Sequence, residues 1–231
     1  MTRAELIQAV ALRMDEITPA AGLDVTVDGS DNNPLYELID GLVNDGVLEL
    51  YSVAPYWRLK QKSFVYSNAL ANSEIQISTV GTRKIIRLKI SDDFLRVAEI
   101  TCADFQRPIT EVFPEQSTEG RRQHNRFLMG KEAKPVGVMS HGMWGSFPCR
   151  EIDCYSLSAD TAVESSNVDA TYIPKPKVID DESSPMVSVE AVVPATLIGA
   201  LEWLIAARAF GARGDVSQAQ ICQQNAQNLI I

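Results

Sequence analysis

The segment PATLIGALEWLIAARAFGARGDVSQAQICQQNAQNLI, residues 194–230, predicts two consecutive helices joined by the short turn GARG. Its first part, 194–210, is apolar nearly all round, which is typical of a buried helix. Its second part, 215–230, starts at Asp215, and Gln218 three residues later completes a capping-box-like start. The chain is therefore expected to end in a helical hairpin.

The last helix carries amides where a free surface helix usually carries Lys and Glu. Its predicted buried stripe is Ala219, Cys222, Ala226 and Leu229. After Asp215 no side chain is charged. Because neutral amides lose less than charged groups on leaving water, this face favours an interface. The predicted subunit-interface residues are Gln220, Gln223, Gln224 and Gln227; the alternative is a solvated, charge-poor chain end.

The N-terminal residues predict two more amphipathic helices. The first, 2–17, opens with a capping box, and the second begins at Asn33-Pro34 and runs to about Val53. Gly41 and Gly46 lie inside the second helix, where each costs up to about 1 kcal/mol relative to Ala. Close packing of another backbone is one reason to keep them, and a kink or early helix end near Gly46 is the alternative.

Residues 61–189 change to the alternation of apolar and polar residues that is typical of strands. The predicted strands are 64–67, 74–78, 84–90, 95–105, 135–140, 147–158 and 168–173, with a turn at 141–145 (HGMWG). We therefore expect an α+β fold. Its helical bundle would be formed by 1–60 with 190–231, around an inserted antiparallel β-sandwich or barrel at 61–189.

A polar insertion at 114–134, expected to include a short helix, interrupts the strands. It holds the one basic concentration of the chain: Arg121, Arg122, Arg126, Lys131 and Lys134. These residues suit contact with phosphates or with an acidic protein partner, and Arg121, Arg122, Arg126 and Lys131 are the predicted partner contacts. An ordinary solvated loop is the alternative.

No motif for catalysis, a cofactor or a metal is present in the sequence. Nucleotide-binding glycine motifs and the Gly-x-Ser-x-Gly elbow are absent, and the four cysteines lack ligand spacing. His124 and His141 fall in predicted polar loops. Glu151 and Asp153 share one face of a predicted strand and would suit acid–base work if desolvated, but a solvated strand face is the preferred interpretation. We predict no enzyme, no cofactor and no metal.

The net charge and the hydropathy of the chain argue against two classes of partner, nucleic acid and the membrane. The net charge is -9 with a pI near 4.8, which argues against a protein that grips nucleic acid over its whole surface. Glu202 and Arg208 make the apolar helix 194–210 a poor membrane span. Met1 leads directly into a charged helix, so no signal peptide is expected and we predict a soluble protein made inside the cell.

The order of segments resembles the head-to-tail adaptors of podovirus-like phages, often called tail tubular protein A, and the ring proteins of crAss-like phages. The resemblance rests on MTRAELIQAVALRMDEI (1–17) with DNNPLYELIDGLVND (31–45), on the closing strand ATYIPKP (170–176), and on the hairpin at 197–230. The hairpin is the most specific part. The basic insertion at 114–134 departs from a generic adaptor.

The resemblance implies a ring of identical subunits, typically twelve, docked beneath the portal protein, with the helices as ring body and the β region facing the tail. Double-stranded DNA would pass through the lumen without sequence-specific binding, and an acidic wall would repel its phosphates. It implies a virion protein assembled in the host cytoplasm. The amide face and the helix with Gly41 and Gly46 are the expected ring contacts.

Two other classes remain open on the sequence. One is a non-catalytic ligand- or carbohydrate-binding β module with helical ends. The other is a hydrolase that uses Asp or Glu, which needs a convergent set of side chains.

Overall fold

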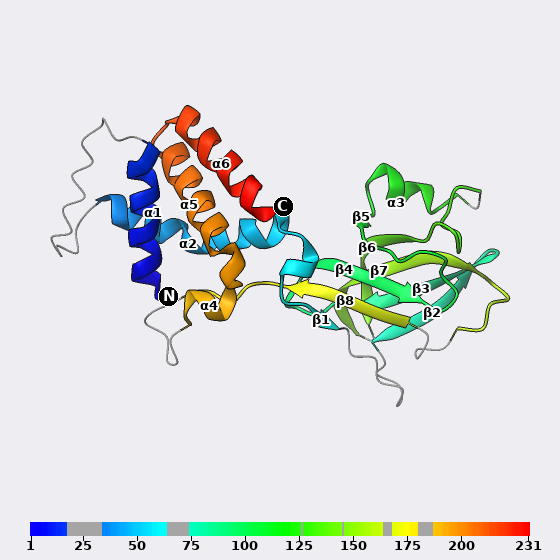
Figure 1. The fold of residues 1–231 in the computed structure, drawn as a ribbon. Coiled ribbons are helices and arrows are strands. Elements are labelled where there is room, and N and C mark those ends of the chain that lie inside the picture. The colour runs from blue at the N-terminus through cyan, green and yellow to red at the C-terminus, as the bar shows by residue number, and fades with distance from the viewer. Residues whose placement is uncertain (18–33, 64–73, 126, 145, 164–167, 180–186) are drawn as a thin grey trace. The chain divides into compact units, whose positions relative to one another are not determined.

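The computed structural model describes residues 1–17, 34–63, 74–125, 127–144, 146–163, 168–179 and 187–231. The predicted strand 64–67 lies outside these ranges. Within them the chain has six helices and two sheets, which confirms the α+β prediction. Contacts divide it into a helical unit, Met1–Lys60 with Lys175–Ile231, and a β unit, Gln61–Pro174 (Figure 1).

The helical unit is built around its most apolar helix. Its helices are α1 (Arg3–Ile17), α2 (Pro34–Val53), α4 (Val189–Val192), α5 (Ile198–Ala212) and α6 (Val216–Ile230), with short 3₁₀ helices at Tyr56–Arg58 and Ala195–Leu197. α5 contacts α1, α2 and α6. In Figure 1, α5 and α6 form the hairpin, and α2 runs across α1 and α5. Fully buried side chains such as Leu6, Ile39 and Ile205 fill the space between them.

The capping side chains predicted at Thr2 and Asp215 are present, and α2 begins at Pro34 as predicted, whereas its predicted N-cap Asn33 lies outside the described residues. The backbone N–H of Glu5 donates to the Thr2 hydroxyl at 3.2 Å, and the backbone N–H of Thr2 donates to the Glu5 carboxylate at 2.8 Å. The Asp215 carboxylate accepts from the Gln218 backbone N–H at 3.2 Å. These side chains satisfy N–H groups that the helices themselves leave unpaired.

The two glycines of α2 have different environments. A Cβ added at Gly46 would lie 2.5 Å from Cγ1 of Ile205, so the close neighbour there is a side chain of α5 rather than the backbone that the sequence predicted. At Gly41 nothing lies within 4 Å, so the close-packing explanation is wrong for this position. α2 continues past Gly46 to Val53, so the helix does not end early there. Because the Gly46 face is already packed inside the subunit, it is not available for a ring contact.

α5 is the core helix of its unit, as predicted. The segment Ala195–Ala212 is long and apolar enough to cross a membrane, but 56% of it is buried inside the structure. Its two charged side chains are paired, Glu202 with Arg13 at 3.2 Å and Arg208 with Glu49 at 2.6 Å.

The β unit consists of two sheets. The three-stranded sheet has the order β1 (Lys62–Ser63), β8 (Val168–Pro174), β4 (Phe94–Cys102). The five-stranded sheet has the order β2 (Ile75–Val80), β3 (Arg83–Lys89), β7 (Phe147–Ser158), β6 (Val136–Trp144), β5 (Val112–Pro114). All pairs are antiparallel except β5 with β6, which is parallel. One core cluster holds residues of both sheets, including Ile86, Ile152, Ile100 and Tyr172.

Two local predictions are wrong. The predicted turn 141–145 is wrong for its first four residues, because β6 continues to Trp144, which pairs with Phe147; Gly145 lies outside the described residues. On α6, Leu229 is 45% exposed, whereas Ile230 is buried. The buried stripe continues from Ala226 by four residues rather than three, as a helical period of 3.6 residues allows.

Candidate functional site

The amide face of α6 lies on the surface. Gln220, Gln223, Gln224 and Gln227 are all exposed. Val216, Ile221 and Leu229 are exposed on the same helix, so apolar groups are mixed with the amides. The helix end is held in place by Arg58, whose guanidinium donates to the carbonyls of Leu229 and Ile230 at 2.8 Å each. α6 therefore presents a fixed surface with neutral amides and apolar side chains, a composition that suits contact with another protein.

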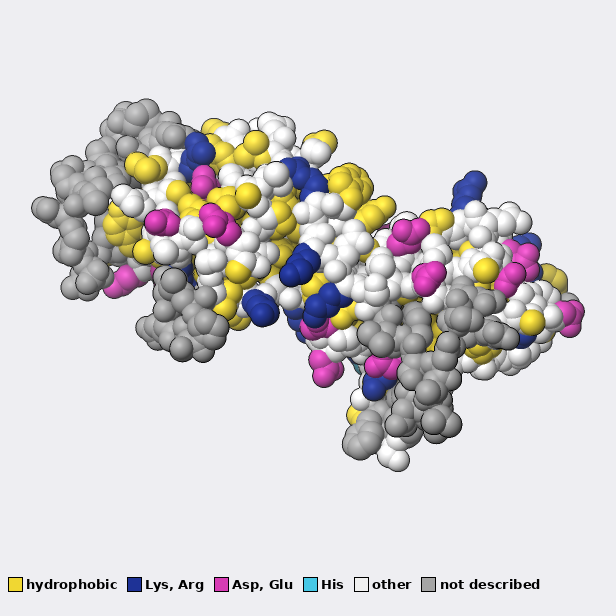
Figure 2. Space-filling view, turned by 60° about the horizontal axis from the view of Figure 1, so that its bottom comes forward, with side chains coloured by type: hydrophobic (Ala, Val, Ile, Leu, Met, Phe, Trp, Pro, Cys, Tyr) yellow, Lys and Arg dark blue, Asp and Glu magenta, His cyan; other side chains and the backbone are white. Residues whose placement is uncertain are grey.

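Other apolar side chains reach the surface of the helical unit, which lies on the left of Figure 2. On α1, α2 and the 3₁₀ helix that follows, the exposed ones are Leu12, Leu48, Val53 and Trp57. They belong to other elements than the α6 residues, although Trp57 lies next to Arg58, which binds the end of α6. A head-to-tail contact needs two such different surfaces on one subunit.

The basic insertion folds as a short helix and a closed loop. Ser117 caps α3 (Thr118–Arg122) by accepting from the Gly120 backbone N–H. The Gln123 side chain donates to the carbonyl of Glu119 at 2.9 Å and accepts from the Gly130 backbone N–H at 2.7 Å. These bonds close the loop between α3 and Gly130.

The same loop packs on the five-stranded sheet. Met129 is buried in a small cluster with Ile85, Val138 and Tyr155. Gly130 approaches β7 so closely that an added Cβ would lie 2.0 Å from the Tyr155 carbonyl oxygen. Met129 and Gly130 thus place part of the insertion against one face of the sheet, while its described basic side chains are exposed.

Of the predicted partner contacts, Arg121, Arg122 and Lys131 are exposed on this insertion, and Arg126 lies outside the described residues. Arg122 and Lys131 line one cavity of about 480 Å³, together with Lys134. Arg121 and Arg122 are adjacent on α3. The structure therefore brings the described members of the cluster to one end of the β unit.

The prediction of a solvated face for Glu151 and Asp153 is wrong. Glu151 is 3% exposed and Asp153 is 5% exposed. On β7, Asp153 lies opposite Arg87 of β3, and Glu151 lies opposite Ser140 of β6. This is the face that the insertion partly covers, so both carboxylates are removed from water.

One guanidinium serves both buried carboxylates. The Arg87 Nε–H donates to Asp153 Oδ1 at 2.7 Å and lies 3.2 Å from Glu151 Oε1. The Ser140 hydroxyl lies 3.4 Å from Glu151 Oε1 and 3.3 Å from Asp153 Oδ2. Among the described residues, Oε2 of Glu151 has no hydrogen-bond partner. An added Cβ at Gly142 would overlap the Glu151 carboxyl group, so a larger residue there would have to displace this carboxylate.

Burial sets the protonation of this cluster. Desolvation raises the pKa of Glu151, Arg87 opposes that rise, and Asp153 adds to it. The hydrogen bond to Asp153 raises the pKa of Arg87. General acid–base catalysis needs a carboxyl oxygen within reach of a substrate atom. Oε2 of Glu151 is buried and Oε1 faces Arg87 and Ser140, so the arrangement suits a structural charge cluster better than a catalytic pair.

A cavity of about 390 Å³ lies beside this cluster. Its polar lining includes Arg87, Glu115, Gln123, His124, Ser140, His141, Glu151 and Asp153. Both histidines are exposed, and His141 belongs to β6 rather than to a loop. The role of Arg87 was not predicted from the sequence, although the apolar residues before and after it in β3 indicate a strand covered on both faces.

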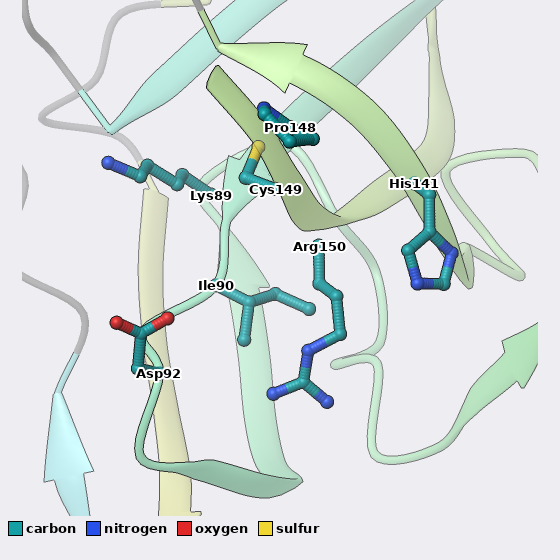
Figure 3. Close-up of a pocket in the computed structure, with 7 residues that line it drawn as sticks. All are labelled: Lys89, Ile90, Asp92, His141, Pro148, Cys149 and Arg150. Carbon is teal, nitrogen blue, oxygen red and sulfur yellow. The ribbon is translucent and has the colours of Figure 1, made fainter.

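A second cavity, of about 500 Å³, lies at the other side of His141 and is shown in Figure 3. Its lining comes from β3 and the following turn, from β6 and from β7. In Figure 3 the side chains of Lys89, Asp92 and His141 point in different directions and do not converge on one point. Among the described residues, no group of three or more His, Cys, Asp or Glu side chains could hold a metal ion.

Comparison with known proteins gives no family for this chain. No protein-family model matches it, and a search of curated proteins finds no match. The functional argument therefore rests on the sequence and on the surfaces described above.

Proposed function

We propose that this chain is a virion structural protein, a ring-forming head-to-tail connector that joins the portal to the tail of a tailed bacteriophage and forms part of the DNA conduit. The order of segments, which resembles such adaptors, supports the place in the virion. The observation that carries the assembly is the exposed, charge-free face of α6, where Gln223 and Gln227 stand among exposed apolar residues.

In the proposed ring, helices from both ends of the chain form the body, and the inserted β region, with the insertion on it, faces a tail protein. The α6 face of one subunit would pack on the exposed apolar residues of α1 and α2 of the next, since these are two different surfaces. Twelve subunits are the expected number. The net charge of -9 suits a lumen through which double-stranded DNA slides without being held.

The experiment is co-expression with the portal protein of the same phage, followed by negative-stain electron microscopy. The wild-type protein is expected to form a ring stacked on the portal. Gln223→Lys with Gln227→Lys is expected to prevent ring formation, because two charges would have to leave water in the interface. Both side chains are exposed, and Gln227 lies in the last turn, where a cation is favourable to the helix dipole, so this variant should keep its fold.

Gln76→Lys with Gln106→Lys is the matched control, since both are exposed amides of the β unit and lie outside the proposed ring contacts. It is expected to assemble as the wild type does. A wild-type protein that stays monomeric and does not bind the portal would contradict the proposal. A gene located away from portal, capsid and tail genes would also remove most of its support.

The alternative function, a non-catalytic ligand- or carbohydrate-binding β module, is favoured by the cavity beside Arg87 and Glu151. Its volume of about 390 Å³ is at the lower end of the range for small-molecule sites, about 300–1,000 Å³. Thermal unfolding with a panel of neutral sugars tests it. A saturable rise in melting temperature that Ser140→Ala removes would favour this function, and no rise with any sugar would count against it.

A further inference from the structure

We propose that the pocket between α3 and residues 127–134, here called the insertion pocket, docks an acidic segment of a partner protein through a bulky apolar side chain. The inference deepens the proposed function and rests on it for the identity of the partner as a portal or tail component. The chemistry of the segment follows from the pocket itself and is tested separately.

The pocket has an apolar base and apolar edges. Phe113, Met129 and Val136 contribute to its lining, and Phe127 and Leu128 do so while remaining 72% and 59% exposed. Large apolar side chains exposed next to each other mark an interaction site more often than isolated ones do. The volume of about 480 Å³ accommodates one or two large side chains, so an apolar anchor is the expected occupant.

The exposed side chains are held in a defined geometry. The backbone N–H groups of Leu128 and of the next residue donate to the Asn125 carbonyl at 2.9 Å, and the N–H of Phe127 donates to the Asn125 side chain at 3.0 Å. The bond between Gly130 and Gln123 closes the loop behind them. Because the loop is already ordered, binding would not have to spend free energy on ordering it.

The rim of the pocket is basic. Arg122, Lys131 and Lys134 line it, and Arg121 lies beside it on α3. The single carboxylate of the lining, Glu119, is 3.9 Å from Arg122, a long exposed pair that offsets little of this charge. In a chain with a net charge of -9, this positive rim selects acidic groups locally.

A protein segment fits these features better than a nucleic acid does. Single-stranded nucleic acid binds along an extended basic groove with several stacked aromatic side chains. The lining described here has Phe127 as its one largely exposed aromatic, and aliphatic groups such as Leu128 and Val136 form much of the rest. The net negative charge of the chain also opposes a polyanion more than a short acidic peptide.

The test is fluorescence anisotropy with the full chain and a fluorescein-labelled peptide, in which a Leu-Phe pair is flanked on each side by Asp and Glu. Binding that weakens with added salt is expected. The same peptide with Asn and Gln in place of the acids should bind at least about tenfold more weakly. Phe127→Ala and Lys131→Glu should each weaken binding by about tenfold or more, as expected for an anchor and a paired charge.

Arg107→Glu is the matched control, because Arg107 is an exposed cation of the β unit that does not line the pocket. It is expected to bind as the wild type does. All the changed side chains are exposed, so circular dichroism should show unaltered folding. Absence of binding, equal binding of the neutral peptide, or binding of a labelled single-stranded DNA oligonucleotide alone would overturn the inference.

A labelled KVIDDESS peptide, residues 177–184 of this chain, tests a second copy as the occupant. If this peptide binds more tightly than the designed one, the occupant of the insertion pocket is a neighbouring subunit rather than another protein, and the inference of a portal or tail partner is overturned. If the protein forms rings on the portal but does not bind the peptide, only the docking inference is overturned. If the protein binds the peptide but never forms a ring, the docking inference is supported and the proposed function is contradicted.

Discussion

Gly46→Ala should destabilise the helical unit, although alanine is normally the better helix residue. In the middle of α2 the change gains about 0.5–1 kcal/mol of helix propensity. The new Cβ would lie 2.5 Å from Cγ1 of Ile205, which is fully buried and cannot turn away as the tip of a flexible side chain can. Overpacking of this kind costs about 1–3 kcal/mol. The net loss in free energy of unfolding is therefore expected to be about 1 kcal/mol.

Gly41→Ala is the matched control in the same helix. Nothing lies within 4 Å of an added Cβ there, so this variant should gain about 0.5–1 kcal/mol. Urea unfolding followed by circular dichroism at 222 nm measures both. In an Ile205→Ala background the clash is gone, and Gly46→Ala should then stabilise. Equal stabilisation by both alanine variants in the wild-type background would refute the packing of α2 on α5 at Gly46.

Three further changes test the local interactions. Asp215→Ala removes the cap of α6 and should lower the free energy of unfolding by about 1 kcal/mol in urea titrations, whereas an unchanged midpoint would show that the cap contributes nothing. Arg87→Met leaves two buried carboxylates without their cation. Because Arg87 is one-third exposed, the loss should be about 2–3 kcal/mol at neutral pH, below the range for a fully buried pair. It should grow as pH rises and Glu151, whose pKa burial raises, ionises. A loss in free energy of unfolding that becomes smaller at higher pH would contradict the pairing of Arg87 with Glu151 and Asp153. The Lys62 ammonium holds the pKa of Asp93 well down, to about 2 against an ordinary 3.8, so its contribution is present above about pH 4 and is lost as pH falls toward 2. Asp93→Asn should cost less than about 1 kcal/mol at pH 7 and only a small part of that at pH 2, where Asp93 is about half protonated; an equal effect at both pH values would exclude this ion pair as the cause.

The parts of the fold that depend on local chemistry could be predicted from the sequence. The start of α6 at Asp215 and that of α1 at Thr2 follow from capping residues and a helical period, which act within a few residues. The α+β class follows from the change of period between the ends and the middle of the chain.

The missed features depend on contacts between distant segments. The burial of Glu151 and Asp153 depends on the insertion, which folds over their face of the sheet from some thirty residues away in the sequence. The role of Gly46 depends on where α5 packs. Alternation in β7 indicates two faces, but it does not tell which further segment covers the polar one. The insertion pocket was missed for the same reason, because its lining is assembled from β5, α3, β6 and the loop between them.

The most direct test of the proposed connector is a cryo-electron microscopy reconstruction of the protein bound to its portal. We expect a closed ring stacked on the portal, in which the α6 face with Gln223 and Gln227 packs against a different surface of the neighbouring subunit. A ring in which this face points to solvent would contradict the assigned interface. A protein that remains monomeric beside an intact portal would contradict the proposed function itself.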